Sequence, residues 1–141
     1  MNIREQVREM KQIWPKFAVE YTRRHVVWKG PMVSTLTGQT FQVQISYPVD
    51  QTVQVKILDP PLQVLDQGQP IPHVYPNLSL CLFYPANREW NPLMSISRTI
   101  VPWTYEWLFF YEVWRRTGIW EGGGIEHKRV KRSYAEKKSP Y

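Results

Sequence analysis

The sequence of 141 residues has one cysteine, Cys81. A single cysteine excludes an intramolecular disulfide and any zinc site built from several cysteines, and we expect no metal. No apolar run approaches the roughly 18 residues that cross a bilayer, and no apolar N-terminal segment precedes a small-residue cleavage site. We therefore expect a protein of the reducing cytoplasm, without a membrane partner. No glycine-rich phosphate loop is present either, so we expect no ATP binding and no cofactor.

Acidic residues are the scarcer charge: 12 Asp and Glu stand against 18 Lys and Arg, a net charge of +6. Residues 125–141 hold six Lys/Arg and two Glu and so carry +4 of this excess. We divide the chain into a folded domain, residues 1–124, which ends in three glycines, and a basic tail, residues 125–141. The tail is either a solvated end that maintains solubility or a contact for nucleic acid or an acidic partner.

Aromatic residues are abundant, at 14% with seven tryptophans, which is typical of a core of large side chains. Near the N-terminus, Ile3, Val7, Met10 and Trp14 recur at helical spacing, with charges on the opposite face. Pro15 cannot continue the helical hydrogen bonds, so the pattern predicts an N-terminal helix that ends near Trp14.

Three segments after this helix predict an antiparallel β-meander. They are residues 25–29, closed by Gly30-Pro31, residues 40–47 and residues 52–58. The last two alternate strictly between apolar and polar side chains, which is typical of a sheet with one buried face and one wet face. Residues 59–76 hold five prolines without a clear period, and we expect a long loop that leads to the cysteine.

The remaining part of the domain predicts a short strand at residues 78–84 and then a long helix after Pro92. Pro102 suits the first turn of this helix and Gly118 its C-terminal cap. Four aromatic residues form a stripe that we expect in the core: Trp103, Trp107, Phe110 and Trp114. The order helix, meander, loop with cysteine, helix predicts an α+β fold.

Cys81 lies in the apolar run Leu80-Cys81-Leu82-Phe83, and two interpretations stay open. A lone cysteine among apolar residues is commonly a small buried hydrophobe. Against this, the long loop is a usual place for function, and Asn77 and a pair of ring side chains, His73 and Tyr75, lie close in sequence. A thiol suffices for thioester exchange if a donor stabilises the oxyanion. The nucleophile hypothesis requires a sulfur that is open to solvent.

The segment resembles the active-site region of ubiquitin-conjugating enzymes. That family has a His-Pro-Asn tripeptide before an aliphatic-Cys-Leu run and then Trp-x-Pro. The chain has Tyr75-Pro76-Asn77, Leu80-Cys81-Leu82 and Trp90-Asn91-Pro92 in the same order. Tyr47-Pro48 and Asp59-Pro60-Pro61 also resemble family features. The resemblance covers about residues 1–120 and implies the ubiquitin-conjugating-enzyme-like fold: N-terminal helix, antiparallel meander, active-site loop and long C-terminal helix.

More closely, the chain resembles the stand-alone bacterial conjugating-enzyme homologues of CBASS anti-phage operons. The pattern H-x-Y-P-N-x-S-L-C-L at residues 73–82, the run Met-Ser-Ile-Ser at 94–97 and the segment 117–127 carry this resemblance. It implies a transferase that forms a thioester with the C-terminus of a cGAS-like nucleotidyltransferase (CD-NTase) and passes it to an amine.

Residue by residue, the resemblance implies that Cys81 is the thioester nucleophile and Asn77 the oxyanion stabiliser. Tyr75 stands where the family has histidine, so His73 is the candidate to brace the loop, and the interval from Asn77 to Cys81 is shorter than in eukaryotic enzymes. Trp90 is either a wall that contacts the substrate beside the cysteine or a loop anchor. No acid, neither Glu89 nor Asp66, is assigned a role.

Besides the enzyme, a non-catalytic module that scaffolds the nucleotidyltransferase stays open as the alternative. Nucleic-acid binding is the weaker third interpretation, because the aromatic residues fall on an amphipathic helix and do not alternate with Lys and Arg. The oligomeric state and the acceptor amine have no signal in the sequence.

Overall fold

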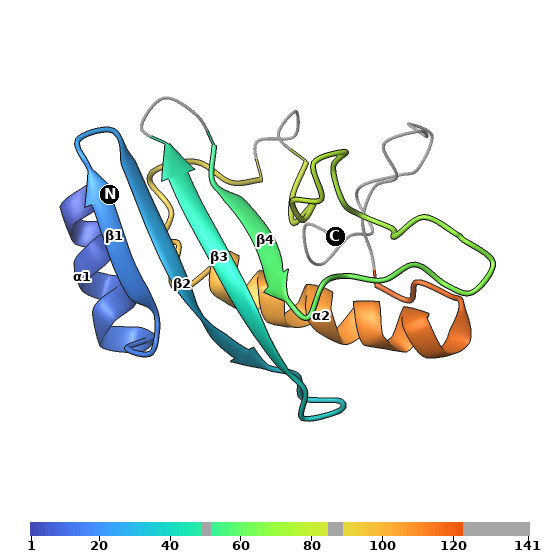
Figure 1. The fold of residues 1–141 in the computed structure, drawn as a ribbon. Helices are drawn as coiled ribbons and strands as arrows, with labels where there is room; N and C mark the ends of the chain where they lie inside the picture. Colours follow the sequence, from blue (N-terminus) through green and yellow to red (C-terminus); the bar gives the residue numbers. More distant parts are fainter. Residues whose placement is uncertain (49–51, 85–88, 123–141) are drawn as a thin grey trace.

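The computed structural model describes residues 1–48, 52–84 and 89–122, and the predicted basic tail at 125–141 lies outside them. In chain order the elements are α1 (Ile3–Ile13), β1 (Ala18–Thr22), β2 (His25–Val33), β3 (Thr40–Pro48), β4 (Gln54–Asp59) and α2 (Ile100–Thr117). The four strands form one antiparallel sheet in the order β1-β2-β3-β4, and both helices lie behind it (Figure 1). The α+β meander with a helix at each end is confirmed.

Helix α1 begins and ends where the sequence predicts. Asn2 and Glu5 form a capping box, in which each side chain accepts the backbone N–H of the other residue. The helix is capped at Trp14, directly before Pro15.

The run at residues 94–97 holds α1 against the start of α2. Gln6 is fully buried, and its side chain donates to the carbonyl of Met94 (2.9 Å) and accepts the N–H of Ile96 (3.0 Å). Glu9 accepts hydrogen bonds from both serines of the run. This part of the sequence pattern is therefore a packing element of the fold.

The sheet buries one face, as the alternation predicts. Val26, Trp28 and Met32 of β2 are at most 1% exposed, and the strand alternates between buried and more exposed residues along its length. The prediction that Gly30-Pro31 closes the strand is wrong, because β2 continues to Val33. Since β1 pairs with β2 only as far as Lys29, the edge of β2 is open at Pro31, where a proline is tolerated.

Two further predictions about strands need correction. Strand β1 was missed, because it is an edge strand with almost every residue exposed and so has no burial pattern in its sequence. The strand predicted at residues 78–84 is absent from the described structure, which has there only an isolated bridge between Val74 and Leu80. Four consecutive residues from Leu80 to Phe83 are buried, whereas a strand with one wet face would alternate.

Helix α2 confirms the aromatic stripe and its boundaries. Trp107 and Trp114 are buried, and Trp103 and Phe110 are half-buried against the same core. Gly118 caps the helix in the left-handed conformation, with φ of 78°. Neither described helix has the length and apolar character that a membrane crossing requires.

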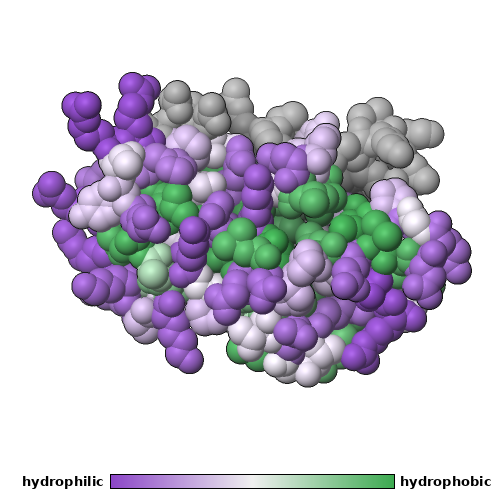
Figure 2. Space-filling model, viewed as in Figure 1, coloured by the Kyte–Doolittle hydropathy of each residue, from purple (hydrophilic) through white to green (hydrophobic). Residues whose placement is uncertain are grey.

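The sheet face turned toward the viewer is mainly polar over β1 and β2 (Figure 2). Apolar surface is more frequent toward β4 and the segments beyond it. In these segments Leu58, Val64 and Leu78 each expose about half of their surface, at 45%, 48% and 51%. On this face, the surface near β4 and the segments after it is thus more apolar than the surface over β1 and β2.

Candidate active site

Cys81 lies in a narrow loop, residues 73–83, which we call the cysteine loop. Its two arms run antiparallel: Cys81 donates its backbone N–H to the carbonyl of His73 (2.9 Å), and Tyr75 donates to that of Ser79 (2.9 Å). Residues that face each other across such a pair project to the same side, as do residues two apart along one arm. The side chains of His73, Tyr75 and Cys81 therefore belong to one side of the loop.

Hydrogen bonds to β4 and to α2 attach the cysteine loop to the rest of the domain. The N–H of Leu80 donates to the carbonyl of Val55 (2.8 Å), so one arm lies against the edge strand β4. The indole of Trp107 in α2 donates to the carbonyl of His73 (3.1 Å). The loop is thus fixed between β4 and the aromatic stripe of α2.

The tip of the loop is built by Asn77 and Ser79. The side-chain oxygen of Asn77 accepts the backbone N–H of Ser79 (3.0 Å) and its hydroxyl (2.7 Å). Because a backbone N–H can only donate, the orientation of the Asn77 amide is determined, and its NH2 group points away from Ser79. Asn77 is exposed, and its hydrogen bonds within the described residues go to Ser79 and not to Cys81.

The cysteine itself is buried, with 4% of its surface exposed. Its sulfur lies 3.7 Å from the carbonyl oxygen of Phe83, and the flanking Leu80 and Leu82 are 4% and 2% exposed. The expectation of a sulfur open to solvent is therefore wrong for this structure. The physical reason is that the whole apolar run turns into the core, where its burial stabilises the loop.

Tyr75 is the predicted site residue that contacts the thiol. Burial raises the pKa of Tyr75 well above its ordinary value of 10, and the charge on Cys81 and a hydrogen bond between the two side chains raise it further. Tyr84 adds to this effect. A phenol with a raised pKa stays protonated at neutral pH, so it remains a hydrogen-bond donor to a thiolate.

His73 is held from both sides. Its backbone has φ of 56°, a left-handed conformation that residues other than glycine adopt only when their surroundings hold them. Its ring packs at 5.0 Å on the ring of Trp120, which follows α2 in the sequence. His73 is thus hydrogen-bonded to Cys81 through its backbone and connected to α2 through ring contacts. These are the contacts of a residue that braces the loop.

A groove of about 440 Å³ lies beside the cysteine loop. One side is formed by residues 52–54 at the start of β4, and the other by residues of the loop on both sides of the cysteine, including Tyr75, Asn77 and Phe83. Cys81 is not part of this lining. The groove thus brings Asn77 and Tyr75 to one surface.

The segment after the cysteine is anchored by Trp90 and Glu89. Trp90 is 7% exposed and packs edge-on against Tyr47 (5.9 Å) and on Phe83 (6.0 Å). The carboxylate of Glu89 accepts the backbone N–H of Tyr84 (2.7 Å). This position of Trp90 corresponds to the loop anchor of the two interpretations.

Sequence reasoning missed two residues of the site, Trp107 and Trp120. Trp107 was assigned only to the core, although its indole also holds the carbonyl of His73. For Trp120 the available signal was Gly118 two residues earlier, since a glycine at the C-terminal cap ends the helix and lets the chain turn there.

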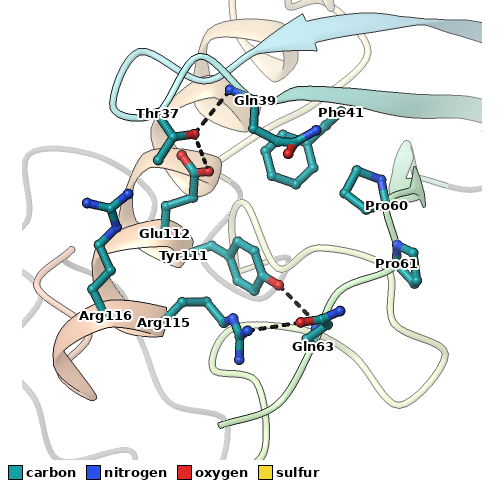
Figure 3. A pocket seen from close by; sticks show the side chains of 10 residues that line it. All are labelled: Thr37, Gln39, Phe41, Pro60, Pro61, Gln63, Tyr111, Glu112, Arg115 and Arg116. Carbon is teal, nitrogen blue, oxygen red and sulfur yellow. Dashed lines mark hydrogen bonds between the residues drawn. The ribbon is translucent and has the colours of Figure 1, made fainter.

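A second cavity, of about 330 Å³, lies at the C-terminal half of α2 (Figure 3). Thr37 donates to the buried carboxylate of Glu112 (2.6 Å), and the N–H of Gln63 donates to the hydroxyl of Tyr111 (2.9 Å). Arg115 donates to the side chain of Gln63 (2.9 Å). These bonds fasten two loops to α2, and no predicted site residue lines this cavity.

Within the described ranges, no three His, Cys, Asp or Glu side chains come together as metal ligands would. A comparison with curated proteins gives no match. A family model, described as Type II CBASS E2 protein, matches residues 6–128, which is most of the chain. The chain therefore belongs to the family of type II CBASS E2 proteins, and it has an E2-like role in anti-phage defence.

Proposed function

We propose that this protein is a cysteine-dependent conjugating enzyme of the bacterial cytoplasm with a ubiquitin-conjugating-enzyme-like fold. Its substrate is the C-terminus of a cGAS-like nucleotidyltransferase (CD-NTase), held as a thioester on Cys81 and then transferred to an amine. The observation that carries the proposal is the contact between the phenol of Tyr75 and the thiol of Cys81 in a loop beside an open groove. Family membership supports the general role of a conjugating enzyme.

The reaction consists of two acyl transfers. The thiolate of Cys81 attacks the carbonyl carbon of an activated acyl group, the S–C bond forms and the leaving group departs. An amine then attacks the same carbon, the N–C bond forms, the S–C bond breaks, and the proton of the amine restores the thiol. The activated acyl group is supplied by a separate adenylating enzyme or by cleavage of a peptide bond.

The surrounding residues have separate roles in this proposal. Tyr75 donates to the thiolate and Asn77 supplies its NH2 group to the oxyanion, an interaction worth about 2.7–4 kcal/mol in comparable sites. His73 holds the cysteine loop in place. Trp90 positions the segment after the cysteine and so shapes the groove for the substrate.

Because Cys81 is 4% exposed, the proposal requires that the cysteine loop opens before each reaction. The groove and the exposed tip of the loop are where a substrate peptide would first bind. Binding of the peptide to the open form then shifts the loop toward that form, since a ligand stabilises the state that it binds.

The burial of Cys81 also favours a second candidate function, a binding module that scaffolds the nucleotidyltransferase without chemistry. In this function the thiol is a core residue, and the groove and the apolar surface around it provide the docking site. The two functions predict different results when Cys81 is replaced.

The two candidate functions are distinguished by intact-mass measurement. The protein is mixed with its nucleotidyltransferase and a source of activated acyl groups. If the protein is an enzyme, the wild type is expected to form an adduct that a thiol reductant cleaves. The variant Cys81→Ser is expected to form an ester that the reductant does not cleave. Asn77→Ala is expected to slow transfer by a larger factor than it weakens binding of the nucleotidyltransferase, and Ser79→Ala is the control for the shape of the loop tip. Copurification that is unchanged in Cys81→Ala, without any adduct of the wild type, would favour the binding module.

A further inference from the structure

The chain turns back on α2 after Gly118, and we call residues 118–122 the strap. Its single large aromatic residue, Trp120, packs on three rings: His73 at 5.0 Å, Trp107 at 5.5 Å and Phe110 at 6.1 Å between ring centroids. His73 belongs to the cysteine loop and the other two to α2. Trp120 is therefore the side chain through which the strap joins the helix to the loop.

The strap is seated directly against the helix. A Cβ atom added at Gly122 would lie 2.6 Å from a ring carbon of Phe110, so no side chain fits there unless the strap or the ring moves. Gly118, with φ of 78°, allows the sharp turn that begins the strap. Two glycines thus determine the path that brings Trp120 onto His73.

His73 connects the contact with Trp120 to the backbone of Cys81. Its carbonyl oxygen accepts both the N–H of Cys81 (2.9 Å) and the indole N–H of Trp107 (3.1 Å), while its ring rests on Trp120. Its left-handed backbone persists only if packing holds it, and the ring contact with Trp120 is part of that packing. The indole N–H of Trp120 has no hydrogen-bond partner among the described residues, so Trp120 acts through its ring surface.

We propose that Trp120 is a positioning residue for Cys81: the strap holds His73, and His73 holds the arm of the loop that carries the thiol. This inference rests on the proposed thioester chemistry and adds to it a segment that lies beyond the cysteine loop. It predicts that a loosened strap raises the accessibility of the thiol and lowers the rate of transfer. The thiol becomes more accessible to a small reagent, and transfer to an amine becomes slower because the loop no longer aligns the thiol.

The test uses the purified full chain, in which Cys81 is the only thiol and alkylation by iodoacetamide therefore reports on one site. Trp120→Ala is expected to raise the alkylation rate at pH 7 roughly tenfold, the factor that corresponds to the loss of a few ring contacts. Gly122→Ala, which displaces the strap without changing Trp120, is expected to do the same. Trp120→Phe, which keeps a ring on His73, is expected to stay within about threefold of the wild type.

The matched control is Trp14→Ala. Trp14 is also half-buried, packs on Tyr105 at 5.7 Å and donates to the carbonyl of Ser97 (2.8 Å), but it lies at the end of α1. This variant is expected to lower thermal stability without a change in alkylation rate. Alkylation of Trp120→Ala at the wild-type rate, or an equal rise in Trp14→Ala, overturns the inference. If the strap variants behave as expected but the wild type forms no adduct with the nucleotidyltransferase, the positioning stands and the proposed function fails.

Discussion

The hydrogen bond between Tyr75 and Cys81 predicts how the pH dependence of the thiol changes when the hydroxyl is removed. The raised pKa of Tyr75 keeps the phenol protonated, so it donates to the thiolate and favours that form. Tyr75→Phe removes only this donor and keeps the ring. A hydrogen bond to a charged group is worth about 1.5–3 kcal/mol, and about 1.4 kcal/mol corresponds to one pH unit. At the lower end of this range, the midpoint of the alkylation profile moves up by about one unit.

The assay is the rate of iodoacetamide alkylation from pH 6 to 10, with the single cysteine as its only target. At pH 7 the variant is expected to react roughly tenfold more slowly, and at high pH the two rates converge. Tyr105→Phe is the control, because Tyr105 is another half-buried phenol whose hydroxyl bonds to the backbone at Val33. An unchanged midpoint in Tyr75→Phe would refute the reasoning, as would an equal shift in Tyr105→Phe.

Three further predictions concern stability and are measured by denaturant unfolding. The hydrogen bonds from Ser95 and Ser97, and then that from Arg98, lower the pKa of Glu9 below 4.5. Glu9→Gln is therefore expected to cost about 1 kcal/mol of stability at pH 7 and progressively less as the pH falls below 4.5. A cost that is independent of pH would exclude the charge of Glu9 as its source. Gly30→Ala is expected to cost about 1–3 kcal/mol, because its Cβ would lie 2.9 Å from the Cα of Phe17; full stability would mean that β1 shifts freely. Leu78→Gly is expected to stabilise the fold by about 0.5–1 kcal/mol, since Leu78 has φ of 68° and is half exposed; destabilisation would mean that its packing outweighs the strain.

The fold was predictable where local chemistry and burial agree. Strands β3 and β4 alternate because one face of the sheet is wet, and α2 ends at Gly118 because only glycine adopts its backbone angle without strain. Strand β1 was not predictable, because an exposed edge strand is specified by its pairing with β2 and not by a pattern of its own. The same holds for the extension of β2 past Gly30, which is specified by its pairing with β3.

The sequence pointed to candidate site residues but not to the way they are arranged. The sequence identified His73, Tyr75, Asn77 and Cys81, and the structure gathers them in one loop. Which of them touches the thiol depends on the antiparallel pairing of the two arms, and that pairing brings Tyr75 to Cys81 while Asn77 turns to Ser79. The burial of the sulfur was also not predictable, because it results from the way the loop docks between β4 and α2.

The cysteine loop combines a buried thiol with a backbone under strain, and these two properties have opposite effects on how often it opens. Burial of the apolar run holds the loop closed. The left-handed backbone at His73 costs about 1–3 kcal/mol, and it is held by contacts with Trp107 and Trp120 that are lost if the loop leaves its site. Release of the loop therefore costs less than its buried surface alone implies. In the proposed reaction, a closed loop that is partly strained would protect Cys81 between turnovers and would still allow a bound peptide to expose it.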